Sequence, residues 1–134
     1  SGLWKHLGDL MSTIKANDLT NVSGGIPTVK SQQLIPTAWV NLNGDNTIAI
    51  NDSENVSSLT DDGTGDYVIN FATNMANVNF AVACSASDAS FSTANMMANG
   101  YEYRVNYIKI GTFDHGGTAR DLGATCVIVM GGQS

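Results

Sequence analysis

Two short stretches of this chain combine residue types that could bind a metal or take part in catalysis. The first is DDGTGD at 61–66, where three carboxylates surround two glycines. A calcium site needs six to eight oxygen ligands, and the stretch lacks both the EF-hand loop pattern and its terminal bidentate glutamate. Aspartate and glycine are also typical residues of tight turns, where positive φ angles are common. The stretch therefore favours a solvated hairpin turn, and we predict no metal site.

The second stretch is Asp114-His115-Gly116-Gly117, with Arg120-Asp121 following. A hydrolase built on His115 needs a nucleophile and an acid that orients the histidine. There is no G-x-S-x-G motif, and the other histidine, His6, lies near the start of the sequence. No G-x-G-x-x-G motif or P-loop supports a nucleotide cofactor. We predict a non-enzymatic protein without a cofactor, and a small hydrolase that uses His115 stays as an alternative.

Charge is sparse and unevenly distributed along the chain. Charged residues make up 13% of the 134 residues, and the formal net charge is −6. Residues 1–35 carry three lysines and two aspartates, a net charge of +1. Residues 36–134 carry three basic and ten acidic residues, a net charge of −7. An acidic body repels phosphate backbones, so we predict no nucleic-acid partner. No apolar run approaches the ~20 residues of a membrane span, so we predict no membrane insertion.

Short alternating runs indicate that residues 36–134 form one β-rich body. At 66–71, Tyr67, Ile69 and Phe71 alternate with Val68 and Asn70, which is typical of a strand. Similar runs occur at 38–42, 48–50, 56–60, 79–85, 101–110 and 124–130, and the first two flank a predicted hairpin turn at 43–46. About seven strands without helical segments between them predict an antiparallel β-sandwich, jelly-roll-like in type.

Two predicted connections are longer than a sandwich needs, and they supply the candidate recognition residues. Residues 86–100 include Met96 and Met97, which would be adaptable apolar contacts in an exposed loop. Residues 111–123 include His115 and Arg120. Long loops on a rigid scaffold often carry binding sites. For the first loop we favour the alternative, that it covers one end of the core or packs against a symmetry mate.

The two cysteines, Cys84 and Cys126, each lie within an apolar run. We predict that both are buried free thiols that act as small hydrophobic residues. Their spacing leaves a disulfide between them open.

The N-terminal 35 residues predict a docking arm. Apolar residues recur at helical spacing along one face: Leu3, Trp4, Leu7, Leu10, Met11 and Ile14. Gly8 weakens such a helix by about 1 kcal/mol relative to alanine, so an extended anchor is the alternative. Residues 17–35 contain the turn signal SGGIP at 23–27 and read as a linker. We predict a short amphipathic helix followed by a linker, with Trp4, Leu7 and Met11 as assembly contacts.

One block of the sequence resembles a known family. It consists of AWVN at 38–41, Asn43-Gly44, NVSS at 55–58, Asp61, Gly63, GDY at 65–67 and Asn70-Phe71. This block resembles the AWVNFNG…NVSS…GDY pattern of small structural and tail-fibre-like proteins of tailed-bacteriophage virions. The likeness covers roughly residues 11–80, a little over half of the chain.

The resemblance implies a non-enzymatic virion component, such as a tail fibre, a head fibre or appendage, or a decoration protein. It also implies other virion proteins as partners and a homo-oligomer, for example a trimer. Host attachment through a surface glycan is a further expectation. The competing hypothesis is a carbohydrate-binding sandwich module, with Trp39 or the pair Tyr101 and Tyr103 as stacking residues.

Overall fold

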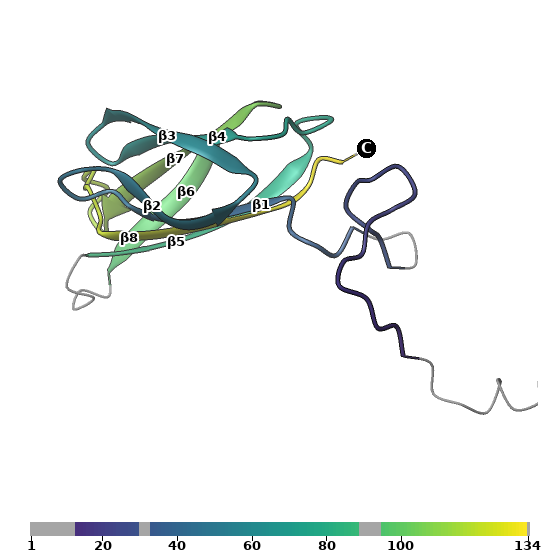
Figure 1. The fold of residues 1–134 in the computed structure, drawn as a ribbon. Coiled ribbons are helices and arrows are strands. Elements are labelled where there is room, and N and C mark those ends of the chain that lie inside the picture. Colours follow the sequence, from purple (N-terminus) through teal and green to yellow (C-terminus); the bar gives the residue numbers. More distant parts are fainter. Residues whose placement is uncertain (1–12, 30–32, 89–94, 134) are drawn as a thin grey trace, which may run out of the picture.

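The fold is that of a computed structural model, which describes residues 13–29, 33–88 and 95–133. The described chain forms eight strands and no helix (Figure 1). The strands are β1 (Ala38–Asn43), β2 (Ala49–Glu54), β3 (Val56–Gly63), β4 (Asp66–Phe71), β5 (Phe80–Ser87), β6 (Met96–Tyr103), β7 (Tyr107–Asp114) and β8 (Ala124–Gly131). The prediction of a mainly β protein is confirmed.

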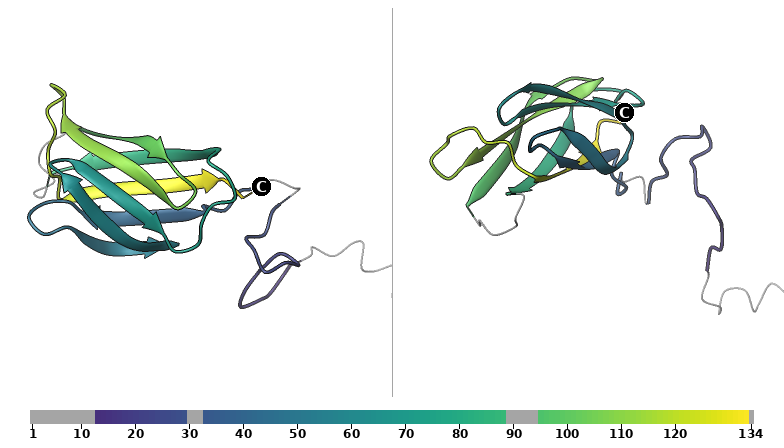
Figure 2. Two further views of the ribbon diagram at one scale, coloured as in Figure 1. Left: turned by 90° about the horizontal axis from the view of Figure 1, so that it is seen from above. Right: turned by 60° about the vertical axis from the view of Figure 1, so that its left-hand side comes forward.

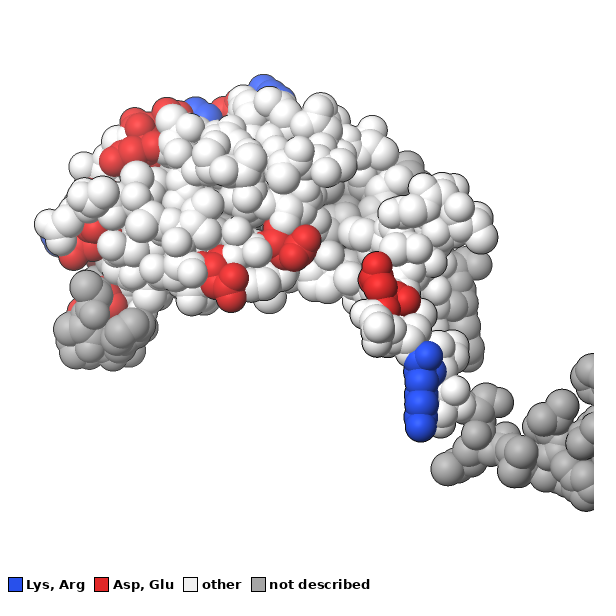
Figure 3. Space-filling model, viewed as in Figure 1, with Lys and Arg blue, Asp and Glu red and all other residues white. Residues whose placement is uncertain are grey.

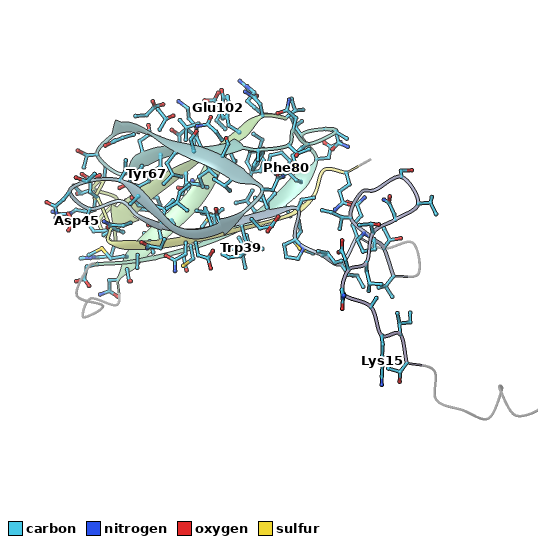
Figure 4. The ribbon with its side chains drawn as sticks, in the orientation of Figure 1. Lys15, Trp39, Asp45, Tyr67, Phe80 and Glu102 are labelled. Atoms are coloured by element: carbon cyan, nitrogen blue, oxygen red, sulfur yellow. The ribbon has the colours of Figure 1, made fainter. Side chains whose placement is uncertain are left out.

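The strands form two antiparallel four-stranded sheets, which enclose one core. Sheet I has the order β2-β1-β8-β5, and sheet II has the order β3-β4-β7-β6. The core contains inward side chains of both sheets: Val40, Leu42, Val127 and Val129 from sheet I, and Tyr67, Ile69, Ile108 and Ile110 from sheet II. Figure 4 shows Tyr67 and Phe80 between the sheets, and Trp39 and Glu102 on their opposite outer faces.

The register between neighbouring strands explains why the alternating runs form strands with one buried side. Ile69 of β4 pairs with Ile108 of β7, and the next inward pair is Tyr67 with Ile110. Since successive side chains point to opposite faces, a slip of one residue would expose this whole apolar row. The same alternation in β8 buries Val127 and leaves Ile128 on the outer face.

The connections differ from the predicted jelly-roll-like winding. Strands β5 to β8 follow a Greek-key path, in which β8 returns through a long connection to pair with β5. The first four strands instead form the hairpins β1–β2 and β3–β4. A jelly roll takes two Greek keys, so this fold is wound more simply.

Asn55 alone connects β2 in sheet I to β3 in sheet II, at a positive φ of 54°. Its Nδ2 donates to the carbonyls of Thr37 and Thr73, both at 3.1 Å, and its Oδ1 accepts from the Thr73 amide at 2.7 Å. The asparagine side chain therefore fixes the crossing between the sheets.

Three predicted segments have wrong bounds. The run at 101–110 is two strands, because a turn after Tyr103 lets the Arg104 amide donate to the Tyr107 carbonyl at 3.0 Å. The predicted loop at 86–100 loses both ends to β5 and β6, since Met96 pairs with Asp114. The loop predicted to begin at 111 begins only after β7 ends at Asp114.

The N-terminal arm has no helix in its described part, residues 13–29 and 33–35. The predicted helix and its contacts Trp4, Leu7 and Met11 lie outside the described residues. Asn21 instead organises a turn: its Oδ1 accepts from the amides of Ser23 at 2.9 Å and Gly25 at 2.8 Å. Figure 2 shows the described arm leaving the body at the end where the C-terminus lies.

Candidate functional site

The connection after β7 is held by the carboxylate of Asp114. Its Oδ1 accepts from the amides of Gly116 and Thr118, both at 3.0 Å, and its Oδ2 lies 3.1 Å from Nε of Arg120. The Thr118 amide, followed by the Arg120 guanidinium, lowers the pKa of Asp114 below its ordinary value. Asp114 thus serves the loop, and this use argues against a hydrolase in which it orients His115.

The far end of the same connection is tied to sheet II through Asp121. Its Oδ1 accepts from the Gly65 amide at 2.7 Å and from the Tyr67 hydroxyl at 3.0 Å. Burial, together with the hydrogen bond to Asp121, raises the pKa of Tyr67 to about 12. Thr112 adds a hydrogen bond from its hydroxyl to the Arg120 carbonyl at 2.6 Å. His115 and Arg120 are therefore exposed residues on a pinned loop.

The three carboxylates of DDGTGD point to three different partners. Asp61 accepts from the Gly63 amide at 3.0 Å, Asp62 pairs with Lys109 at 2.6 Å, and Asp66 accepts the Tyr101 hydroxyl. Among the residues that the structure describes, no three metal-binding side chains lie together. The stretch is the β3–β4 hairpin, as predicted.

A polar surface covers the outer side of sheet II. Lys109 lies 2.6 Å from Asp62 and 3.8 Å from Glu102, and the Tyr107 hydroxyl donates to Glu102 at 2.6 Å. Tyr101 is 47% exposed beside these groups. Sequence reasoning missed this network because its members lie on three strands that only the fold brings together.

Tyr101 borders a shallow hollow of about 270 Å³. Asp66, Gly111, Phe113 and Ala119 line it as well. Burial and the hydrogen bond to Asp66 raise the pKa of Tyr101 to about 12, so the hydroxyl is a neutral donor over the ordinary pH range. Tyr103 points the other way and packs on Phe80, with ring centroids 5.2 Å apart. The predicted tyrosine pair is therefore split between two faces.

Part of the outer side of sheet I is apolar, in contrast to the polar outer side of sheet II. We call it the apolar face and define it by Trp39, Ala81, Ala83, Ile128 and Met130. In register, Ile128 lies between Trp39 and Ala83, and Met130 lies beside Ala81. Ile128 is 47% exposed.

Both cysteines are free, and they lie on opposite sides of sheet I. Cys126 pairs with the exposed Asn41 and Ser85 on the outer side. Cys84 pairs with the buried Val127 and packs against the core. Each is half-buried, so the prediction of free thiols is confirmed and that of full burial is wrong.

The predicted recognition methionines are strand residues, because β6 begins at Met96. Met96 is half-buried, whereas Met97 points outward from sheet II and is 43% exposed. Met97 is far along the chain from His115 and Arg120, but its strand pairs with β7, which leads into their loop.

The arm exposes many large aliphatic side chains. Ile14 is 80% exposed, and the other members of this group are Leu19, Val22, Val29, Leu34 and Ile35. Val22 lies at the tip of the turn organised by Asn21 and is fully exposed. A hollow of about 990 Å³ separates part of the arm from the body.

Comparison with protein-family models, curated proteins and solved structures finds no match. In the described part of the chain, no helix has the length and apolar character to cross a membrane.

Proposed function

We propose that this chain is a non-enzymatic structural protein of a bacteriophage virion that assembles as a homo-oligomer through its N-terminal arm. Tail fibre, head fibre, appendage and decoration protein are the roles that fit. The proposal includes a short amphipathic helix before residue 13, with Trp4, Leu7 and Met11 as further contacts, and contacts with other virion proteins. A jelly-roll-like winding is not part of it.

The arm is the observation that carries the assembly half of this proposal. Six large aliphatic residues of the described arm are more than 40% exposed, and one of them, Val22, is fully exposed. Large apolar surfaces that stay in water mark interaction sites. The virion half rests on the resemblance of the block at 38–71.

Assembly is tested by the mass of the full chain in solution. We expect an oligomer by analytical ultracentrifugation, and a shift toward monomer in the variant Ile14→Ser/Leu19→Ser/Val22→Ser. A wild-type chain that stays monomeric at all concentrations refutes the assembly proposal.

The virion location is tested by immunogold electron microscopy of phage particles from the genome that encodes this chain. Antibodies against the body should decorate one fixed position on each particle. Particles that carry no label, although the chain is present in the lysate, contradict the location.

A carbohydrate-binding module is the second candidate, and the hollow beside Tyr101 favours it. An exposed tyrosine ring next to a carboxylate offers a stacking surface and a hydrogen-bond acceptor to a sugar. On a glycan array, Tyr101→Ala should lose any glycan that the wild type binds, whereas Tyr103→Phe, at a core-facing ring, should keep it. A wild type without any bound glycan removes this candidate.

A further inference from the structure

We propose that residues 13–29 of one copy dock on the apolar face of a second copy, the face defined by Trp39, Ala81, Ala83, Ile128 and Met130. This inference rests on the proposed assembly and names the two surfaces that meet. Separate observations identify the two surfaces, the segment that covers the apolar face, and the copy from which this segment comes.

The arm offers an ordered apolar contact rather than a loose chain. Asn21 closes its turn with side-chain bonds to Ser23 and Gly25, and its Nδ2 donates to the Ile26 carbonyl at 3.2 Å. Asparagine turns of this kind are self-contained. The turn therefore presents Val22 to solvent without help from the body, and part of the ordering cost of binding is already met.

The apolar face is the surface that fits such a contact. An antiparallel sheet with one solvated side normally carries polar residues there. Sheet II follows this rule, with Lys109, Glu102 and Asn70 on its outer side. Sheet I departs from it, because Ile128, with Trp39 and Ala83 as its neighbours in register, occupies the middle of its outer side.

Charge decides between an arm and a second body as the occupant. Asp52 and Glu54 lie on β2 at the edge of the apolar face, and residues 36–134 carry a net charge of −7. Two bodies that met through this face would bring like charges together, which costs free energy. The docking segment, residues 13–29, carries Lys15 and Asp18 and therefore no net charge, so its binding avoids this repulsion. Figure 3 shows most of the acidic side chains on the body, and one acidic side chain near the basic side chain of the arm.

The path of the arm favours a neighbouring copy. The Thr37 amide donates to the Val129 carbonyl at 2.8 Å, and the Thr37 hydroxyl donates to the Gly131 carbonyl at 2.9 Å. From this anchor the chain runs beyond the end of the sheets, and Lys15 lies clear of its own body (Figure 4). Ile14 and Val22 are thus placed to reach another molecule.

Cys126 provides a direct probe, since it lies on the outer side of sheet I among the face residues. In a Cys84→Ala background, Cys126 is the only thiol. We expect its labelling by a maleimide to be at least about tenfold slower in the oligomer than in dilute monomer, the ratio that corresponds to ~1.4 kcal/mol of docking. The triple arm variant Ile14→Ser/Leu19→Ser/Val22→Ser should remove this protection and the oligomer together.

A second variant tests the receiving surface with a matched control. Ile128→Glu places a charge on the apolar face, and Met97→Glu places the same charge on sheet II at nearly equal exposure, 47% against 43%. We expect Ile128→Glu to be monomeric with rapid Cys126 labelling, and Met97→Glu to behave as wild type. Thermal unfolding confirms that both are folded.

Four results overturn the inference. An oligomer with rapidly labelled Cys126, or one that survives Ile128→Glu, assembles through another surface, and the proposed function stands without the docking site. A monomer whose Cys126 is protected by its own arm excludes the second copy. A monomer with rapid labelling overturns both the inference and the assembly.

Discussion

The hydroxyl oxygen of Tyr67 lies 3.0 Å from Oδ1 of Asp121, and this contact joins the centre of sheet II to the end of the β7–β8 connection. The same hydroxyl lies 3.1 Å from the Gly44 carbonyl in the β1–β2 turn. The Tyr67 hydroxyl therefore contacts both the β1–β2 turn and the connection between β7 and β8.

Tyr67→Phe should destabilise the protein by about 1–3 kcal/mol, because it leaves the buried Gly44 carbonyl without its donor and removes a hydrogen bond to Asp121. Urea unfolding measures the loss. Tyr101→Phe is the matched control: its hydroxyl also donates to a carboxylate, that of Asp66, but at the surface, where water replaces the lost donor, so it should change stability by less than about 0.5 kcal/mol. Equal effects of the two variants would contradict a structural role for the Tyr67 contact.

The stabilisation from Tyr67 should also depend on alkaline pH. Its pKa is raised from 10.0 to about 12 in the folded protein. A group whose folded pKa lies above its unfolded value stabilises the fold fully below the unfolded pKa, and this stabilisation is lost as the pH rises through the folded pKa. The stability difference between wild type and Tyr67→Phe should therefore be constant below pH 10 and shrink above it. A stability difference that stays constant up to pH 12 would argue against a raised pKa of Tyr67 in the folded protein.

Gly65→Ala should be costly, because Gly65 has a φ of +65° and an added Cβ would lie 2.3 Å from the Thr112 carbonyl oxygen. Gly117→Ala, at a φ of +82° with open space around it, isolates the backbone strain from the clash. We expect Gly117→Ala to lower the free energy of unfolding by about 1–2 kcal/mol. Gly65→Ala should lower it by more, and thermal unfolding measures both losses. Equal losses of stability in the two variants would show that the turn at Gly65 can move away from the Thr112 carbonyl without cost.

Acid should loosen the loop that Asp114 holds. Hydrogen bonds to its carboxylate lower its pKa below 3.8, so the stabilisation is present above that value and is lost as the pH falls through the folded pKa. NMR should show that the Gly116 and Thr118 amides lose protection against hydrogen exchange, relative to the intrinsic rate at each pH, in this range. In Asp114→Asn, fast exchange should already be present at neutral pH; an unchanged loop in that variant would rule out the carboxylate as its anchor.

Asn55→Ala should lower stability by about 1–3 kcal/mol, since it removes the bonds to Thr37 and Thr73 at a residue with positive φ. Asn46→Ala, at a φ of 58° in an exposed hairpin, carries the same backbone strain and is the control. Denaturant unfolding of the two variants separates strain from side-chain bonding. A smaller loss at Asn55 than at Asn46 would contradict its role at the crossing.

Strands were predictable where the pattern that creates them is local. Alternation at 38–42, 66–71 and 124–130 follows from burial of one face, and each run is a strand of the fold. The turn after Tyr103 was missed because Arg104-Val105-Asn106 contains no glycine or proline. The strand character of 86–87 and 96–100 comes from pairing with distant partners, which outweighs the weak β-propensity of alanine, serine and asparagine.

The candidate sites depended more heavily on the fold. The acidic residues at 61–66 and 114–121 were candidates for chemistry, but they bind partners 2 to 56 residues away, and these contacts make them structural anchors. The contrast between the two outer faces could not be predicted without the register of β8 against β1 and β5. The exposed residues of the arm were visible in the sequence only as an apolar composition.

The anchoring of Thr37 to the end of β8 has a mechanical consequence. Both chain ends leave the body at one pole, where β1 begins and the antiparallel β8 ends. Tension applied between the two ends would load the hydrogen bonds of this pair one after another, as in opening a zipper. Tension applied between the arm and the opposite pole would load them together in shear. A body held by its arm and pulled from the far loops therefore resists force in its stronger direction.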